Sequence, residues 1–190
     1  AALLAVLLMA AVPAMATTYD LDSSHSSVGF KIKHMAISNV KGTFSEFSGT
    51  FDFTPGESDS WNVEAVIQLK SISTGDQKRD NHLLAEDFFD AEKYPTMVFK
   101  STGVKMKDDE EGQLMGTLTM HGITLPVTLD LEIGGTVTDP WGNDRAGFSA
   151  TGKINRKDWG LSYGSVMEGG GLVIGDDVKI SLEVEGVKQK

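Results

Sequence analysis

Apolar and polar residues alternate with a period of two along most of the chain. In residues 28–33, Val28, Phe30 and Ile32 alternate with small or charged residues, and in residues 61–69 Trp61 and Val63 begin a similar apolar face. Such alternation is typical of β-strands that are buried on one face. Further stretches predict strands in the same way: 42–53, 96–105, 112–121, 124–133, 145–154 and 177–187.

Roughly eight long strands joined by short connections predict an all-β fold. They favour an eight-stranded antiparallel up-and-down barrel, because closing the sheet removes its exposed edges. A barrel of this size is about wide enough to hold one small ligand. A two-sheet sandwich is the competing architecture. No Gly-, Pro- or Ser-rich linker and no repeat divides the chain, so residues 17–190 are predicted to form a single domain.

The segment 71–95 is charged, yet it contains Leu83, Leu84, Phe88 and Phe89. A plain connecting loop has no reason to keep such large apolar groups in water, whereas a segment that caps an apolar cavity would bury them. Residues 76–86 predict a short helix with Asp76 as its N-cap. We therefore expect a helical lid over one end of the barrel. Its charged members are expected near the mouth: Lys78, Arg79, Asp80 and His82.

Residues 1–16 form an apolar run that ends in Ala14-Met15-Ala16. This pattern is typical of the apolar region and cleavage site of a signal peptide, and the run is shorter than the roughly 20 apolar residues of a membrane span. We expect a partial signal peptide that is removed on export; a buried N-terminal helix is the alternative. Because the chain contains no Cys, we expect no disulfide and no lipidated cysteine. The exported protein is expected to be soluble, without an integral membrane span.

The formal net charge is −10. No basic block offers a stripe for phosphates, so nucleic acid is not an expected partner. A negatively charged protein is also expected to be repelled from anionic lipid surfaces.

Catalytic and metal sites are not predicted. Serines surround His25, with Asp22 close by, but neighbours on a strand point to opposite faces, so His25 cannot face both Ser24 and Ser26. No G-x-S-x-G motif is present. The His residues are scattered without the spacing of metal ligands. We expect Asp22 and Ser24 to hydrogen-bond the backbone at the start of a strand, with His25 in the same network.

Several segments carry a resemblance to a known family. Residues 71–95 read S-I-x-T-G-x-x-x-R-D-x-H-L-x-x-x-D-F-F-D-x-x-x-Y-P, and they are accompanied by the segments 22–30, 116–124 and 175–178 and by Arg156, Asp158 and Gly160. In this order the segments resemble the YceI-like proteins. The resemblance implies a secreted, lipocalin-like barrel that binds polyisoprenoids or other long-chain amphiphiles, and it makes a homodimer plausible.

The resemblance places His34, Arg79, Asp80 and His82 at the polar end of the site. Arg79 suits a phosphate or carbonyl oxygen because its guanidinium is planar; the alternative is an ion pair with a nearby Asp that holds the lid shut. His34 is interpreted as binding a head group or, with slight preference, a backbone carbonyl. Arg156 and Asp158 are interpreted as a structural ion pair at the barrel rim.

The apolar end of a ligand site has many candidates, each of which is equally compatible with a solid core. We expect the cavity lining to come from these residues: Phe30, Ile32, Phe44, Phe47, Phe51, Ile67, Leu84, Phe88, Phe89, Phe99, Leu118, Met120 and Trp159.

The expected function is that of a periplasmic carrier that holds a long-chain isoprenoid lipid, such as a ubiquinone-type quinone or a polyprenyl phosphate. No cofactor and no reaction are expected. One alternative is an enzyme that acts on a similar lipid through His34 or His25. Others are a binder of fatty acids or fatty amides in a stress response, and a structural or interaction protein.

Overall fold

The computed structural model describes residues 16–166 and 172–190. The predicted signal peptide, residues 1–16, lies almost entirely outside the described residues and stays a prediction. Within the described ranges, no helix is both long and apolar enough to cross a membrane.

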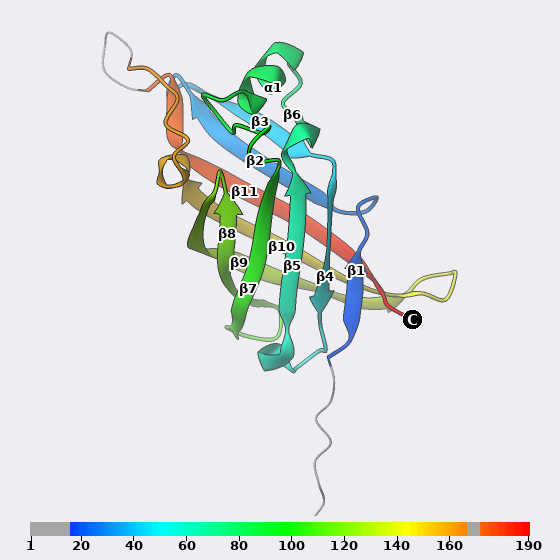
Figure 1. Ribbon diagram of the computed structural model, residues 1–190. Helices are drawn as coiled ribbons and strands as arrows, with labels where there is room; N and C mark the ends of the chain where they lie inside the picture. The colour runs from blue at the N-terminus through cyan, green and yellow to red at the C-terminus, as the bar shows by residue number, and fades with distance from the viewer. Residues whose placement is uncertain (1–15, 167–171) are drawn as a thin grey trace, which may run out of the picture.

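One antiparallel sheet of eleven β-segments makes up the body of the protein (Figure 1). Its segments are β1 Thr18–Leu21, β2 Ser27–His34, β3 Ser38–Phe44, β4 Phe47–Asp52, β5 Asn62–Gln68, β6 Ile72–Ser73, β7 Thr96–Met106, β8 Glu111–Met120, β9 Ile123–Thr138, β10 Asp144–Asn155 and β11 Ile174–Lys188. The helix α1 spans Gln77–Leu84, and the short 3-10 turns are η1 Ser58–Ser60, η2 Leu69–Ser71 and η3 Arg156–Trp159.

The sheet closes on itself through β11. One edge of β11 pairs with β10, and its other edge pairs first with β2 and then with β1. Successive segments β1 and β2, β3 and β4, and β5 and β6 are parts of three long strands, so the eleven segments form eight strands. The predicted eight-stranded up-and-down barrel is confirmed, and the sandwich alternative is wrong.

The strand boundaries differ from the predicted ones where strands change partners. The predicted strand 42–53 is divided at residues 45–46, where Ser45 N–H donates to the Ser71 carbonyl and Gln68 N–H donates to the Glu46 carbonyl. Strands β9 and β11 run several residues further than predicted. Alternation is a poor guide there, because Val137, near the end of β9, remains 64% exposed.

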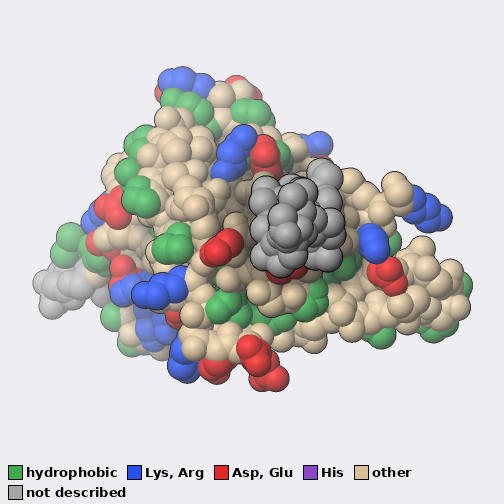
Figure 2. Space-filling view, turned by 90° about the horizontal axis from the view of Figure 1, so that it is seen from below, with side chains coloured by type: hydrophobic (Ala, Val, Ile, Leu, Met, Phe, Trp, Pro, Cys, Tyr) green, Lys and Arg blue, Asp and Glu red, His purple; other side chains and the backbone are tan. Residues whose placement is uncertain are grey.

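An aromatic cluster packs inside the barrel at the end opposite to α1. Tyr19 stacks on Phe51 with ring centroids 5.2 Å apart, and Phe148 meets the edges of Phe51 and Phe53 at 5.1 and 4.8 Å. Trp61 lies 4.7 Å from Phe53. We call these five residues the aromatic floor. Figure 2 views the molecule from this end, where charged side chains of both signs are interspersed with apolar ones.

Candidate functional site

A cavity of about 730 Å³ occupies the inside of the barrel. Its walls come from the inward faces of the strands, its base from members of the aromatic floor and its top from the lid segment. Val28, Phe30 and Ile32 point inward yet are only half-buried, whereas side chains in a close-packed core lose nearly all their accessible surface. The barrel is therefore hollow, and its volume falls within the roughly 300–1,000 Å³ of small-molecule sites.

Most of the predicted apolar residues line this cavity. They are Phe30, Ile32, Phe44, Phe47, Phe51, Ile67, Phe88, Phe89, Phe99, Leu118 and Met120. Contact with a ligand stays a prediction for each of them.

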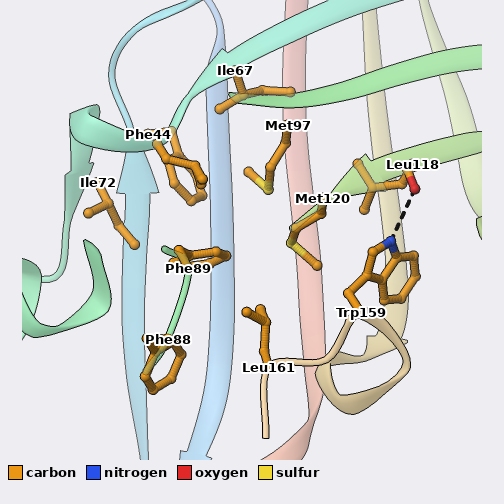
Figure 3. Close-up of a cluster of buried hydrophobic side chains, with 11 residues drawn as sticks. Phe44, Ile67, Ile72, Phe88, Phe89, Met97, Leu118, Met120, Trp159 and Leu161 are labelled. Carbon is orange, nitrogen blue, oxygen red and sulfur yellow. Dashed lines mark hydrogen bonds between the residues drawn. The ribbon is translucent and has the colours of Figure 1, made fainter. Parts of the chain in front are cut away.

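Leu84 and Trp159 lie outside the cavity lining. Leu84, at the end of α1, packs against the buried cluster between the lid and the barrel. Trp159, in η3, is 2% exposed, and its indole N–H donates a 3.1 Å hydrogen bond to the Leu118 carbonyl (Figure 3). Both residues lie behind the cavity lining, a distinction that the local sequence pattern does not make.

The lid begins at a capped helix. The Asp76 carboxylate accepts a 2.9 Å hydrogen bond from the Arg79 N–H, which confirms the predicted N-cap. This backbone hydrogen bond is the main reason why the pKa of Asp76 is lowered. Beyond the helix, Phe88 and Phe89 are buried against the barrel end (Figure 3). The apolar residues of the segment thus hold it over the cavity.

Arg79 and Asp80 both form hydrogen bonds with Thr74 and none with each other. Arg79 Nε donates to Thr74 Oγ1 over 2.7 Å, and Arg79 Nη2 donates to the Thr74 carbonyl over 2.9 Å. The Thr74 hydroxyl donates in turn to Asp80 Oδ1. Arg79 forms no ion pair with an acid in the described part of the chain, so the salt-bridge alternative is wrong. Asp80 is buried behind this network and is absent from the cavity lining.

His34 and His82 both reach the lining. The His82 ring lies 3.0 Å from the Asp87 carboxylate and meets the Tyr163 ring edge-on, with centroids 4.6 Å apart. Within residues 16–166 and 172–190, the His34 ring has no carbonyl partner, which does not support the slightly preferred interpretation. With Lys78 and Arg79, these side chains concentrate the polar groups of the cavity beside the lid.

Several cavity-lining residues that the sequence analysis did not predict lie on the inward faces of the strands. In β5, Val63 and Ala65 line the cavity together with Ile67. In β11, Ile180 and Leu182 belong to the same inward face. The period-two pattern contains this signal once one inward residue of each strand is known.

A charged network at the other end of the barrel surrounds Asp22. The carboxylate of Asp22 accepts hydrogen bonds from Ser24, His25 and Arg145, and these bonds, that of Ser24 foremost, hold the pKa of Asp22 well below its usual range. Ser24 Oγ and Asp22 both contact the same ring nitrogen, Nδ1, of His25. A serine triad uses opposite ring nitrogens for these two partners, so this geometry is not that of a triad. His25 therefore belongs to a structural network.

Asp22, His25 and Glu185 bring three potential metal ligands together. The guanidinium of Arg145 already lies between two of these residues, hydrogen-bonded to Asp22 and Glu185. This cation takes the place that a metal ion would need. The cluster is thus an ion-pair network that joins β1, β10 and β11.

The expected pairing of Arg156 with Asp158 is wrong. Arg156 is buried and donates to the carbonyls of Leu161 and Gly175, and its acidic partner is Asp176, at 3.3 Å. Burial lowers the pKa of Arg156. The residue ties the loop after η3 to the start of β11, while Asp158 remains exposed.

Comparisons with known proteins agree with this architecture. The YceI-like domain family matches residues 19–186. Protein YceI of Escherichia coli O157:H7 is 39% identical over 190 residues, which cover 98% of this chain and 95% of that protein. The YCEI protein of Campylobacter jejuni is 40% identical, with a TM-score of 0.72 over 90% of this chain and 97% of that one. A polyisoprenoid binding domain from Saccharophagus degradans shares the fold, with a TM-score of 0.65 at 16% identity over 91% of this chain and 99% of that one. The chain belongs to the YceI-like family.

Proposed function

We propose that this protein is exported to the periplasm and carries one long-chain isoprenoid lipid inside its barrel. The observation that carries the proposal is the hollow interior of about 730 Å³, which is lined mostly by apolar side chains and has most of its polar residues beside the lid. A chain-like amphiphile matches this distribution, since its tail would lie along the barrel and its head group beside Arg79 and His82. The Saccharophagus degradans domain, described as polyisoprenoid-binding, lends support from the same fold.

The energetics favour a long tail. Each buried CH₂ group contributes about 0.8 kcal/mol, so a tail of about 20 carbons gives a gross figure of roughly 16 kcal/mol. Ordering the tail and losing its free motion offset much of this gain. Selection by tail length is therefore expected to exceed selection by head group, and ubiquinone-type quinones and polyprenyl phosphates are both candidate cargoes.

Binding without catalysis is the second part of the proposal. Within the described residues, no nucleophile, base and orienting group converge in the cavity in the arrangement that an enzyme requires. Storage and delivery of the lipid require no cofactor. An enzyme acting on the same lipid would instead depend on His34 or His82, which face the cavity.

Native mass spectrometry of the protein purified from the periplasm without detergent tests the proposal. We expect a stoichiometric adduct that lipid extraction identifies as an isoprenoid. Ala65→Trp would fill the cavity and remove the adduct, because Ala65 faces inward on β5. Its control, Val66→Trp, alters the next residue of the same strand, which faces outward, and would keep the adduct.

Loss of the adduct in both variants, or a clean apo mass for the wild type after incubation with isoprenoid lipids, would refute the carrier. A fatty acid or fatty amide adduct would support the carrier function but show that the cargo is not an isoprenoid. Light scattering of the same preparation tests whether the protein forms the homodimer that the family resemblance implies.

A further inference from the structure

Lysine side chains form a row across the outer wall of the barrel. Lys153 on β10 pairs in register with Lys179 on β11, Lys179 pairs with Lys31 on β2, and Lys31 pairs with Lys41 on β3. Neighbouring strands are only about 4.8 Å apart, so these four residues lie side by side. We call them the lysine row; Figure 1 shows β10, β11 and β2 next to one another along this wall.

This row is electrostatically unfavourable for the isolated barrel. Like charges directly opposite each other on neighbouring strands destabilise a sheet. Lys153 has an acidic partner, Asp177, at 3.0 Å. In the described part of the chain, Lys31, Lys41 and Lys179 take part in no ion pair. A chain with a net charge of −10 has many acids available, yet this wall leaves its cations uncompensated.

The hairpin that carries Lys31 and Lys41 ends in an exposed apolar tip. Ile37 is 85% exposed and Met35 is 42% exposed. The tip is the three-residue connection between the paired residues His34 and Ser38. It contains a β-turn closed by a hydrogen bond from Ile37 N–H to the His34 carbonyl, and the two central residues, Met35 and Ala36, have positive φ, at 49° and 60°. Asn-Gly is the preferred pair for such a turn. Neither the conformation nor the exposure favours Met-Ala-Ile here, which indicates a role outside the fold.

The tip lies beside the mouth of the cavity. His34, which precedes it, lines the cavity, and Met35 N–H donates a 2.8 Å hydrogen bond to the carbonyl of Val173, another lining residue. The turn lies at the same end of the barrel as α1 (Figure 1). Lys31 precedes Met35 by four residues, or about 13 Å along an extended strand. Lys33 lies between them; it is exposed and also borders the cavity.

We propose that the β2–β3 hairpin docks the mouth of the barrel onto an anionic phospholipid bilayer. The apolar tip, residues 35–37, enters the interfacial region, while Lys31, Lys33, Lys41 and Lys179 contact anionic head groups. An apolar anchor and a basic patch together are the combination that holds proteins at membrane surfaces. Docking in this orientation places the cavity mouth against the lipid. The proposal rests on the outer surface and requires no particular cargo.

A bilayer fits this surface better than a second copy of the chain does. A symmetric dimer through this wall would bring lysine rows together, and their repulsion would oppose it. The expected repulsion from anionic lipid follows from the total net charge of −10 and takes no account of where the charges lie on the surface. Asp177, beside the row, is already paired with Lys153, and Glu183 and Glu185 lie at least four residues from Lys179 along β11, so the lysine row would orient this wall toward the membrane.

Vesicle co-sedimentation of the exported protein tests the docking. The probes are vesicles of phosphatidylcholine alone and vesicles of phosphatidylcholine with phosphatidylglycerol. The row variant is Lys31→Gln/Lys41→Gln/Lys179→Gln. Its matched control, Lys100→Gln/Lys105→Gln/Lys107→Gln, changes the net charge equally on β7 and in the turn after it, and β7 is four strands away from β11. All variants share one N-terminus, so differences among them report the altered residues.

We expect the wild type to prefer the anionic vesicles and the row variant to bind them on the order of 100-fold more weakly. The control should stay within about threefold of the wild type, because its charges lie beyond the Debye length of about 8 Å. A tip variant, Met35→Asn/Ala36→Gly/Ile37→Thr, should bind about tenfold more weakly or worse. It should melt at the same temperature or higher, because Asn-Gly suits the turn.

Equal losses in the row variant and its control would overturn the proposal, since net charge alone would then govern binding. Failure of the wild type to bind anionic vesicles at low salt would also overturn the proposal. A tip variant that binds the anionic vesicles like the wild type would overturn insertion of the tip and the docked orientation that depends on it. Lipid adducts measured on the same variants separate this outcome from any failure of the carrier function.

Discussion

Arg79 and Thr74 are joined by two hydrogen bonds at the base of the lid, from Nε to the threonine hydroxyl at 2.7 Å and from Nη2 to its carbonyl at 2.9 Å. The same hydroxyl donates to Asp80, which is 8% exposed. One threonine thus connects a cation at the cavity mouth with a buried acid. This junction positions the first turn of α1 over the barrel.

Thr74→Val is expected to loosen the lid, because it leaves the Asp80 carboxylate with one hydrogen bond fewer in a buried position. A cost of about 1–3 kcal/mol is expected. Hydrogen exchange should report faster opening of residues 77–91, with the β8–β9 strands still protected. Thr119→Val, which removes an exposed hydroxyl pair with Thr124, serves as the control. Equal exchange in the two variants would contradict the role of Thr74.

Trp159→Ala should lower the free energy of unfolding by about 3–5 kcal/mol, because a large buried side chain and its hydrogen bond to Leu118 are lost. Trp141→Ala should change it by less than about 0.5 kcal/mol, since Trp141 is 81% exposed. Urea unfolding followed by circular dichroism measures both values. Similar costs for the two variants would show that Trp159 does not support the barrel wall.

Gly42→Ala should destabilise the barrel by about 1–3 kcal/mol. A Cβ atom at Gly42 would lie 2.3 Å from Cζ of Phe30, so the ring would have to move into the cavity. Gly147→Ala is the control, because its Cβ would meet the Val184 carbonyl at an ordinary 3.8 Å. Thermal melts compare the two. A neutral Gly42→Ala would mean that the Phe30 ring moves freely.

Acid should weaken the fold through Asp22 and Asp139. Hydrogen bonds from Ser24 and Arg145 lower the pKa of Asp22, and Arg145 is the main cause of the lowered pKa of Asp139. A carboxyl with a lowered folded-state pKa stabilises the protein above its unfolded pKa of about 3.9, and this stability is lost as the pH falls below that value.

Arg145→Gln should therefore reduce stability at pH 7 and flatten the loss between pH 5 and pH 2, the range set roughly by these pKa values. Urea unfolding across that range provides the measurement. Lys100→Gln, which removes an exposed ion pair with Glu64, should leave the slope unchanged. If the free energy of unfolding of Arg145→Gln fell with decreasing pH as steeply as that of the wild type, Arg145 would not be the cause of the acid sensitivity.

Local patterns were sufficient for the strands and for the cap of the lid. Alternation marked the inward faces around Phe30 and Ile67, and Asp76 was recognisable as an N-cap from its position before a short helix. Trp159 and Asp80, which were expected at the cavity, lie outside its lining. Both are buried, but burial against the lid or wall and exposure to an internal cavity look alike in a sequence.

The sequence by itself therefore determined which residues face inward on each strand and that a lid should exist, because both follow from side-chain spacing within a few residues. Only the tertiary structure decided which distant residues become partners. Arg79 hydrogen-bonds to Thr74, Arg156 pairs with Asp176, and four lysines lie side by side on four neighbouring strands. These depend on the register that barrel closure imposes between distant segments. For the same reason a net charge of −10 concealed a basic wall: composition sums the charges, and only the strand pairing places them side by side.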